Sequence, residues 1–168
     1  GVSELLRLVD AAAISPAPGL DDSDGLLDEV SSAAAECGTE MVYITQDSLL
    51  TAGEIELAIF APLSAGDANE SGLIIHGGVA GLSVLITGDV GASTERELLE
   101  TKIIGETDVL IVGHHGSSGS TCLELMEELR PEHSVVSVGY NSYGHPTQGA
   151  LERASGFGAQ LWRTGRGG

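Results

Sequence analysis

The sequence predicts a mixed α/β fold with the size of one domain, and three observations support this prediction. After residue 79, apolar segments of strand length alternate with amphipathic segments of helical length, a pattern typical of layered folds with parallel strands. Residues that favour helix starts and stops flank the helical segments. The chain has 168 residues, of which 42% are hydrophobic, so it can bury one core and is too apolar for general disorder.

The first half of the chain is expected to contain two helices followed by strands. Val2, Leu5, Leu6 and Val9 recur at helical spacing, and Pro16 ends that region. The elements expected after it are a loop over residues 16–25, a helix over Leu26–Cys37 that stops at Gly38, strands over 40–63 around a turn at Gly53, and two strands over 71–89 joined at Gly77 and Gly78.

The second half is expected to alternate helices with buried strands. Thr94 with Glu97, and Thr121 with Glu124, fit the capping boxes that open helices. Pro131 is expected to end the second of these helices. The expected order is a helix over 94–103, a strand over 108–112, a helix over 122–129, a strand over 134–139, a helix over 147–155 that closes at Gly156, and a strand over 159–164.

The net charge is −18, from 25 acidic and 7 basic residues, and Lys102 is the sole lysine. Such a surface repels polyanions, which excludes nucleic-acid binding through a basic patch. Any phosphate substrate would need metal ions to offset the repulsion. The charge itself is best explained as a solubility or high-salt adaptation of the surface.

Cys37 and Cys122 lie far apart without a metal-binding or redox spacing, so both are expected to be small buried hydrophobic residues. No apolar run approaches the roughly 18 residues of a membrane span, and the first residues lack a signal-peptide pattern. As given, the chain is expected to be soluble.

Three successive strands end in polar clusters, which contain Asp89, then His114 and His115, and then His145. The carboxyl ends of neighbouring strands line one crevice in layered α/β structures. These side chains are therefore expected to share one pocket, where a rigid strand end can hold an imidazole at a fixed distance from a metal.

Each of these residues has a functional and a structural interpretation. Asp89 could bridge two metal ions about 4 Å apart, or simply end a strand. His114 and His115 should point in opposite directions, so one would be a ligand and the other would support it or pack; both could instead be structural. His145 could be a ligand, a general acid or a phosphate contact, or a loop histidine held by Tyr143 or Asn141.

The remaining polar candidates have plainer interpretations. Ser117, Ser118 and Ser120 could donate hydrogen bonds to a phosphate near the next helix, although such serines more often cap the helix. His76 and His133 are expected to be structural.

Four motifs together resemble the metallo-β-lactamase-like domain of ComEC-type competence proteins, which internalise DNA. They are "LITGD" at 85–89, "DVLIVGHHGS" at 108–117, "SVVSVG" at 134–139 and "YGHP" at 143–146, and the resemblance runs from Asp67 to Arg163. The segment "GDANESGLII" resembles the family's Asn-x-Asn-Ser segment, with Ser71 and Gly72 where Asn and Ser are usual. Asn69 is the residue of that segment that still matches.

The resemblance implies an α/β fold of the αββα sandwich type with a hydrolytic centre of two divalent metal ions, zinc or manganese. Asp89 would be the bridging carboxylate, His115 or His114 a metal ligand, and His145 a substrate-side or proton-transfer group. Asn69 and Ser117 are candidate substrate contacts. The implied partners are DNA and a membrane channel portion of the same protein, with the domain tethered outside the cytoplasmic membrane of a bacterium.

One departure from the family limits these expectations. The family's principal metal motif, His-x-His-x-Asp-His followed by two glycines, does not occur in this sequence. Residues 1–168 are therefore expected to be the C-terminal portion of a single metallo-β-lactamase-like domain, incomplete on its N-terminal side and inactive alone. The alternatives are a stand-alone hydrolase of a small ester or lactone, and a degenerate binding module without enzymatic activity.

Overall fold

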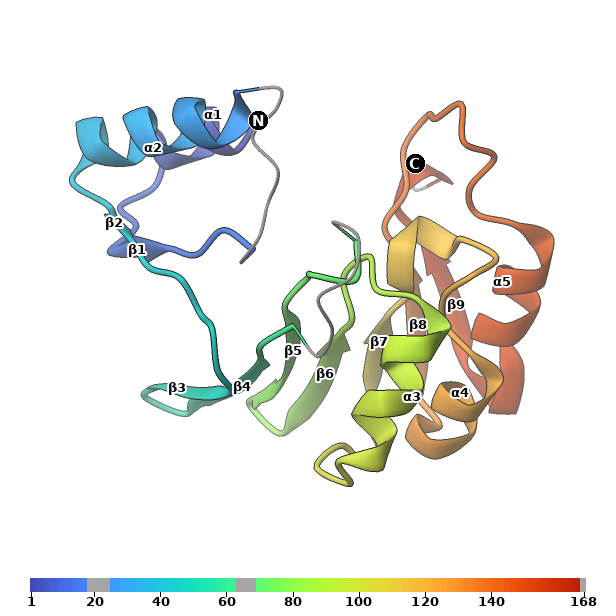
Figure 1. Ribbon diagram of the computed structural model, residues 1–168. Helices are drawn as coiled ribbons and strands as arrows, with labels where there is room; N and C mark the ends of the chain where they lie inside the picture. The colour runs from blue at the N-terminus through green and yellow to red at the C-terminus, as the bar shows by residue number, and fades with distance from the viewer. Residues whose placement is uncertain (18–24, 63–68, 167–168) are drawn as a thin grey trace. The chain divides into compact units, whose positions relative to one another are not determined.

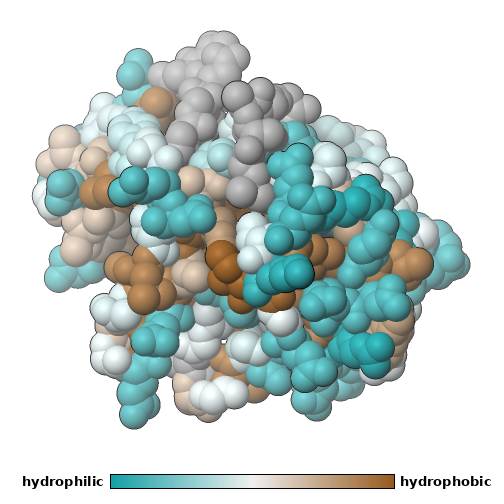
Figure 2. All heavy atoms as spheres, turned by 60° about the horizontal axis from the view of Figure 1, so that its bottom comes forward, coloured by the Kyte–Doolittle hydropathy of each residue, from teal (hydrophilic) through white to brown (hydrophobic). Residues whose placement is uncertain are grey.

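The computed structural model describes residues 1–17, 25–62 and 69–166, and the chain divides into two compact units, Gly1–Thr45 and Gln46–Gly168 (Figure 1). Most of the loop expected over residues 16–25 lies outside the described residues. Figure 2 shows hydrophilic side chains over much of one face, as expected from the net charge of −18.

The first unit consists of two helices and a short parallel strand pair. Its elements are α1 (Val2–Leu6), β1 (Ala13–Ile14), α2 (Leu26–Cys37) and β2 (Glu40–Met41). Leu6 packs with Val30, Ala33 and Ala34 of α2 in a small core. Helix α2 has the predicted bounds and ends at Gly38, whose φ of 74° is the left-handed conformation that favours glycine. Helix α1 stops before Val9, which is exposed.

The second unit is built on a seven-stranded sheet in the order β3-β4-β5-β6-β7-β8-β9. Strands β3 to β6 pair antiparallel, and β6 to β9 pair parallel. The strands are β3 (Ser48–Ala52), β4 (Ile55–Phe60), β5 (Ile74–Val79), β6 (Leu82–Ile86), β7 (Val109–Ile111), β8 (His133–Val136) and β9 (Gln160–Arg163). The helices are α3 (Ala92–Glu100), α4 (Leu123–Leu129) and α5 (Gln148–Ala154), with single 3₁₀ turns at Gly113–Gly116, Gly156–Gly158 and Thr164–Arg166. The predicted alternation of strands and helices is confirmed.

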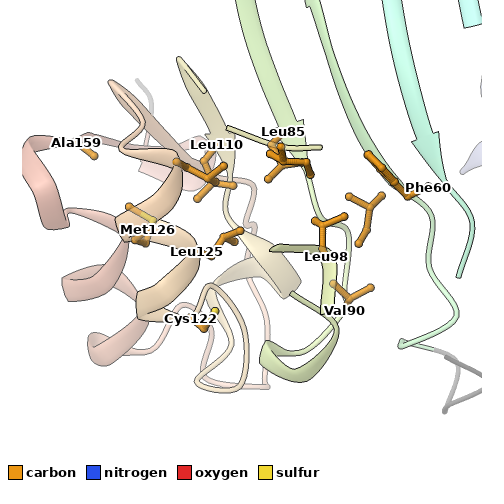
Figure 3. Packing of buried hydrophobic residues seen from close by; sticks show 12 residues of the cluster. Phe60, Leu85, Val90, Leu98, Leu110, Cys122, Leu125, Met126 and Ala159 are labelled. Atoms are coloured by element: carbon orange, nitrogen blue, oxygen red, sulfur yellow. The ribbon is translucent and has the colours of Figure 1, made fainter. Parts of the chain in front are cut away.

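The core of this unit lies between the sheet and its helices. Leu85 and Leu110 are paired on β6 and β7, and both belong to a buried cluster with Leu98 of α3 and Leu125 of α4 (Figure 3). Helix α5 adds Ala154 to a second cluster with Val112 and Val136. The alternate residues of the sheet are less covered: Ile86 and Trp162 are 37% and 49% exposed.

The turn between β5 and β6 lies at Ala80 and Gly81, so the prediction that Gly77 and Gly78 join these strands is wrong. Both of these glycines lie inside β5. A Cβ atom on Gly77 would stand 2.2 Å from the backbone oxygen of Glu56 on β4, so glycine is required by the close approach of the neighbouring strand.

The two predicted capping boxes are also wrong. Helix α3 begins after Gly91, and the hydroxyl of Thr94 donates a hydrogen bond to Glu70 instead of capping the helix. Glu70 also accepts a hydrogen bond from Gly91 N at 2.9 Å. Helix α4 begins after Cys122, and the backbone amides of Thr121 and Cys122, just before the helix, donate to a carboxylate of α3 that is described below. Carboxylates from distant segments of the chain therefore accept hydrogen bonds at these two helix starts, where local capping side chains were predicted.

Cys122 is buried as predicted, but Cys37 is exposed because the buried side of α2 ends one turn earlier, at Ala34. Burial raises the pKa of the Cys122 thiol to about 11. The thiolate is the reactive form, so a thiol reagent near pH 8 should label Cys37 and leave Cys122 unmodified until the protein is unfolded. Mass spectrometry of the labelled protein would count the adducts. Rapid labelling of both thiols in the folded chain would contradict this assignment.

Candidate functional site

The four residues predicted to share a pocket meet at the carboxyl ends of the parallel strands. Asp89 follows β6, His114 and His115 follow β7, and His145 lies between β8 and α5. His115 Nε2 lies 3.8 Å from Asp89 Oδ1, and the rings of His114 and His145 have centroids 5.6 Å apart. These side chains therefore lie near one another as expected, but only His115 and His145 line the cavity described below, so the prediction of one shared pocket is met in part.

His114 and His115 diverge because both adopt the left-handed conformation, with φ of 46° and 54°. Their ring centroids are 6.5 Å apart and the rings are inclined at 74°. His115 approaches Asp89, whereas His114 approaches His145. A left-handed conformation costs a residue other than glycine about 1 kcal/mol or more, so neighbouring contacts must hold this turn. One of them is the hydrogen bond from His114 N to Gly88 O, at 2.9 Å.

The second ring nitrogen of His115 has a defined partner. Its Nδ1 lies 2.7 Å from the backbone oxygen of Ser137. A carbonyl oxygen only accepts hydrogen bonds, so in the neutral ring Nδ1 carries the proton and the lone pair of Nε2 points toward the Asp89 side. Histidines that bind metals in proteins are commonly held in this way.

The loop that carries His145 is closed by Asn141. The Asn141 side chain accepts hydrogen bonds from the backbone amides of Tyr143 and His145, each at 3.2 Å, and donates to His145 O at 2.9 Å. Its amide nitrogen also donates to Gly139 O at 3.1 Å. The backbone of His145 is thus held by Asn141, as one interpretation expected, but His145 Nδ1 is buried without a hydrogen-bond partner among the described residues.

A cavity of about 440 Å³ opens beside these histidines. It is lined by His115, Ser137, Val138, Gly139, Asn141, Tyr143, His145 and Thr164. None of these lining residues is acidic, although the chain carries 25 carboxylate residues. By contrast, another cavity is lined by Glu106, Glu124, Glu127 and Glu128 together with Leu99 and Arg130. The histidine cavity is therefore the more favourable of the two for an anionic group.

Asp89 and His115 are the two predicted metal ligands whose side chains lie together. No group of three or more His, Cys, Asp or Glu side chains able to hold a metal ion occurs among the described residues. A carboxylate and an imidazole fit a divalent metal such as zinc or manganese. The described residues thus bring together two side chains of a kind that can bind such a metal, fewer than the three or four protein ligands of a typical zinc site.

The predicted substrate contacts lie outside the lining of the cavity. Asn69 is exposed, and its backbone oxygen accepts a hydrogen bond from Gly72 N at 3.2 Å. Ser117 stabilises the turn after the histidine pair: its amide donates to His114 O at 2.9 Å, and its hydroxyl accepts from Gly119 N at 3.3 Å.

His76 and His133 also lie outside the cavity lining. Burial lowers the pKa of His76 on β5, and His133 accepts a hydrogen bond from the Trp162 indole at 3.2 Å. His133 is thus held by the neighbouring strand, whereas His76 Nε2 is buried without a hydrogen-bond partner among the described residues, so the structural interpretation of His76 stays a prediction.

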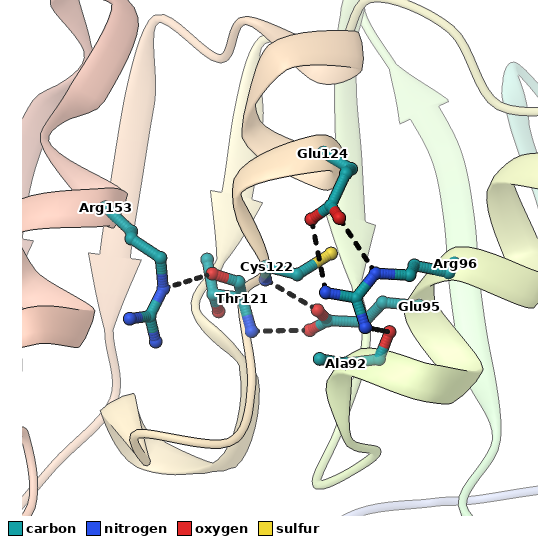
Figure 4. A network of polar contacts seen from close by, with 7 residues as sticks. All are labelled: Ala92, Glu95, Arg96, Thr121, Cys122, Glu124 and Arg153. Carbon is teal, nitrogen blue, oxygen red and sulfur yellow. Dashed lines mark hydrogen bonds and ion pairs between the residues drawn. The ribbon is translucent and has the colours of Figure 1, made fainter.

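Sequence reasoning missed Glu95, a fully buried carboxylate on α3 (Figure 4). It accepts hydrogen bonds from the backbone amides of Thr121 and Cys122, each at 2.7 Å. Burial raises its pKa, and these amides and the nearby Arg153 oppose that shift. The hydroxyl of Thr121 accepts a hydrogen bond from Gly113 N at 3.0 Å, so Glu95 is connected to the residue directly before the histidine pair. The available signal was a charged residue three positions before Leu98, on the apolar side of the helix.

Arg153 of α5 holds the same loop from the other side. Its guanidinium donates to the backbone oxygens of Thr121 at 2.8 Å, Ser120 at 2.9 Å and Ser118 at 3.1 Å. The exposed pair of Arg96 and Glu124 links α3 to α4 nearby, and its hydrogen bonds lower the pKa of Glu124 to about 2 (Figure 4). Three helices thus meet around the loop that follows the histidine pair.

Sequence comparison finds relatives among competence proteins. No family model matches the chain. The chain is 31% identical over 144 residues to ComE operon protein 3 of Bacillus subtilis, covering 84% of the chain and 19% of the relative. It is 35% identical over 101 residues to the competence protein ComA of Neisseria gonorrhoeae, covering 58% of the chain and 14% of that protein. The chain therefore spans less than a fifth of the length of these relatives.

Comparison with solved structures identifies the fold. The metallo-β-lactamase fold protein YhfI of Bacillus subtilis matches with a TM-score of 0.54 at 11% identity, over 99% of this chain and 68% of that one. CmlA, a diiron β-hydroxylase from Streptomyces venezuelae, matches with a TM-score of 0.52 at 15% identity, over 84% of this chain and 35% of that one. The predicted fold class is confirmed. The chain is therefore a sequence relative of the ComEC-type competence proteins over part of their length, and it has a metallo-β-lactamase-like fold.

Proposed function

We propose that this chain contributes part of the metal centre of a DNA-cleaving phosphodiesterase that acts during DNA uptake. The observation that carries the proposal is the pairing of Asp89 Oδ1 and His115 Nε2 at 3.8 Å on neighbouring strand ends. Because Ser137 O occupies the other nitrogen of His115, the imidazole is oriented as a ligand should be. A bound zinc or manganese pair would stabilise negative charge on a phosphate group.

The other residues have roles that follow from their positions. His145 shares the cavity with His115, which places its imidazole where it could exchange a proton with the substrate. The His114 ring lies beside it, at 5.6 Å, and would orient it. Asn69 and Ser117 are proposed as substrate contacts beyond the cavity lining.

The charge distribution fits a phosphate substrate better than the net charge suggests. The described residues that line the cavity include no carboxylate, so an incoming phosphate meets less repulsion there than at the cavity lined by four glutamates. The remaining metal ligands would come from residues other than those that the structure describes.

We further propose that residues 1–168 form part of one metallo-β-lactamase-like domain, tethered to a membrane channel portion of the same protein outside the cytoplasm. Among the described residues, no helix has the length and apolar character to cross a membrane.

The test uses the complete product of the gene that encodes this chain. Asp89→Asn should lower cleavage of labelled DNA at least about 100-fold and reduce the bound zinc or manganese, because a ligand carboxylate loses its charge. Metal content and cleavage would be measured on the same preparations. The matched control is Asp10→Asn, which changes an exposed aspartate of the first unit and should leave both quantities unchanged.

Two outcomes would reject this function in favour of the alternatives. Cleavage of an ester or lactone without any cleavage of DNA would indicate a small-molecule hydrolase. A product that binds neither metal would indicate a binding module. Full DNA cleavage by the Asp89→Asn variant would remove Asp89 from the mechanism.

A further inference from the structure

We propose that the Tyr143 ring forms a stacking site for one unpaired nucleobase, so that the cavity receives DNA as a single strand. This inference rests on the proposed function, because it concerns how the same cavity selects its substrate. It goes further by assigning a residue that contacts the base rather than the phosphate.

The first argument is the position and exposure of Tyr143. Its side chain is 82% exposed, yet the residue lines the histidine cavity. The ring is nearly parallel to that of His145, with centroids 6.3 Å apart and planes inclined at 23°. Tyr143 therefore presents an open aromatic surface beside the residue proposed to exchange a proton. Stacking of bases on such rings accounts for much of the sequence-tolerant binding of single strands.

The second argument is that the loop is already ordered around this ring. The amide of Tyr143 donates to Asn141 Oδ1 at 3.2 Å, and the same oxygen accepts from His145 N. Asn141 also reaches Gly139 O and His145 O. Because these bonds hold the backbone at Tyr143, the loop loses little freedom when a base stacks on the ring, which favours binding.

The third argument concerns charge and strandedness. Val138, Gly139 and Thr164 complete the wall near Tyr143, and none of them carries a charge. The phosphates that flank a base can therefore approach without the repulsion that the four glutamates of the cavity beside Glu106 would exert. In a duplex the faces of a base are covered by its neighbours, so only an unpaired, unstacked base can occupy such a site.

The experiment measures binding without cleavage. The 168-residue chain, kept metal-free with EDTA at about 0.15 M salt, which screens the repulsion between the acidic chain and DNA, is titrated into a short fluorescein-labelled oligothymidylate and into an abasic oligomer of equal length, and anisotropy is recorded. The wild-type chain should bind the oligothymidylate more tightly. Tyr143→Ala should weaken that binding between about 5-fold and 100-fold and leave the abasic oligomer unaffected, whereas Tyr143→Phe should bind as the wild type does.

Tyr140→Ala is the matched control. Tyr140 belongs to the same loop and is fully exposed, but it does not line the cavity, so its removal should not change the preference for the base. Equal binding of both oligomers, no binding of either, an unchanged affinity in Tyr143→Ala, or an equal loss in Tyr140→Ala would each overturn the proposal.

The two proposals can fail separately, because this measurement needs neither metal nor turnover. Base-dependent binding lost in Tyr143→Ala, combined with DNA cleavage that is absent from the complete gene product, would reject the nuclease and keep the stacking site. Cleavage that depends on Asp89, combined with binding that ignores the base, would keep the nuclease and reject the stacking site.

Discussion

Glu95→Ala should destabilise the chain by about 3 to 5 kcal/mol, because Glu95 is a buried hydrogen-bonded carboxylate. The substitution leaves the backbone amides of Thr121 and Cys122, now bound at 2.7 Å, buried without an acceptor. It also opens a cavity where a fully buried side chain was. Urea unfolding followed by circular dichroism would measure the change in the free energy of unfolding.

The Glu95→Gln variant separates the effect of side-chain volume on stability from the effect of the carboxylate charge. Glu95→Gln keeps the volume and one acceptor oxygen, but its amide nitrogen would face the second backbone amide, so a smaller loss of about 1 to 3 kcal/mol is expected. Glu97→Ala is the matched control, since Glu97 lies on the same helix and is exposed; it should stay within about 0.5 kcal/mol of the wild type. If Glu95→Ala unfolds at the same urea concentration as Glu97→Ala, the carboxylate does not hold the loop.

Glu95 also shows where sequence reasoning fails. The pattern of Thr121 and Glu124 is a valid local signal for a capping box, but the amides there are bound by a residue 26 positions earlier in the chain. No short-range pattern encodes such a partner, because it depends on how α3 packs beside α4. The same limit explains the wrong prediction of a turn at Gly77. Glycine is required there by the close approach of β4.

By contrast, local sequence patterns were enough to predict where four residues of the site lie: Asp89, His114, His115 and His145. Each follows an apolar segment of strand length, and parallel strands bring their carboxyl ends to one edge. The opposite directions of the two adjacent histidines also follow from local geometry, although the structure achieves them through left-handed backbone rather than a regular strand. The pairing of Asp89 with His115, and of His114 with His145, needed coordinates because either histidine could have faced either partner.

Gly116→Ala should move His145 away from His114 and destabilise the chain by about 2 to 4 kcal/mol. Gly116 has a φ of +84°, and a Cβ atom there would stand 2.5 Å from Pro146 Cβ and 3.1 Å from Pro146 Cα. Left-handed strain costs an alanine about 1 kcal/mol, and forcing Pro146 away costs about 1 to 3 kcal/mol more. Because Gly116 O also accepts the hydrogen bond from Thr147 N at 2.9 Å, the segment that carries His145 would move as a unit.

The movement should be visible apart from the loss of stability. The rings of His114 and His145 are 5.6 Å apart, so their imidazole NMR signals should shift together in Gly116→Ala. Gly119→Ala is the matched control, since its Cβ atom would meet only Ser117 Oγ, at 3.9 Å, without left-handed backbone; neither the signals nor the unfolding free energy should change by more than about 0.5 kcal/mol. Unmoved histidine signals in a destabilised Gly116→Ala variant would show that Gly116 serves the fold alone and that another contact keeps His145 beside His114.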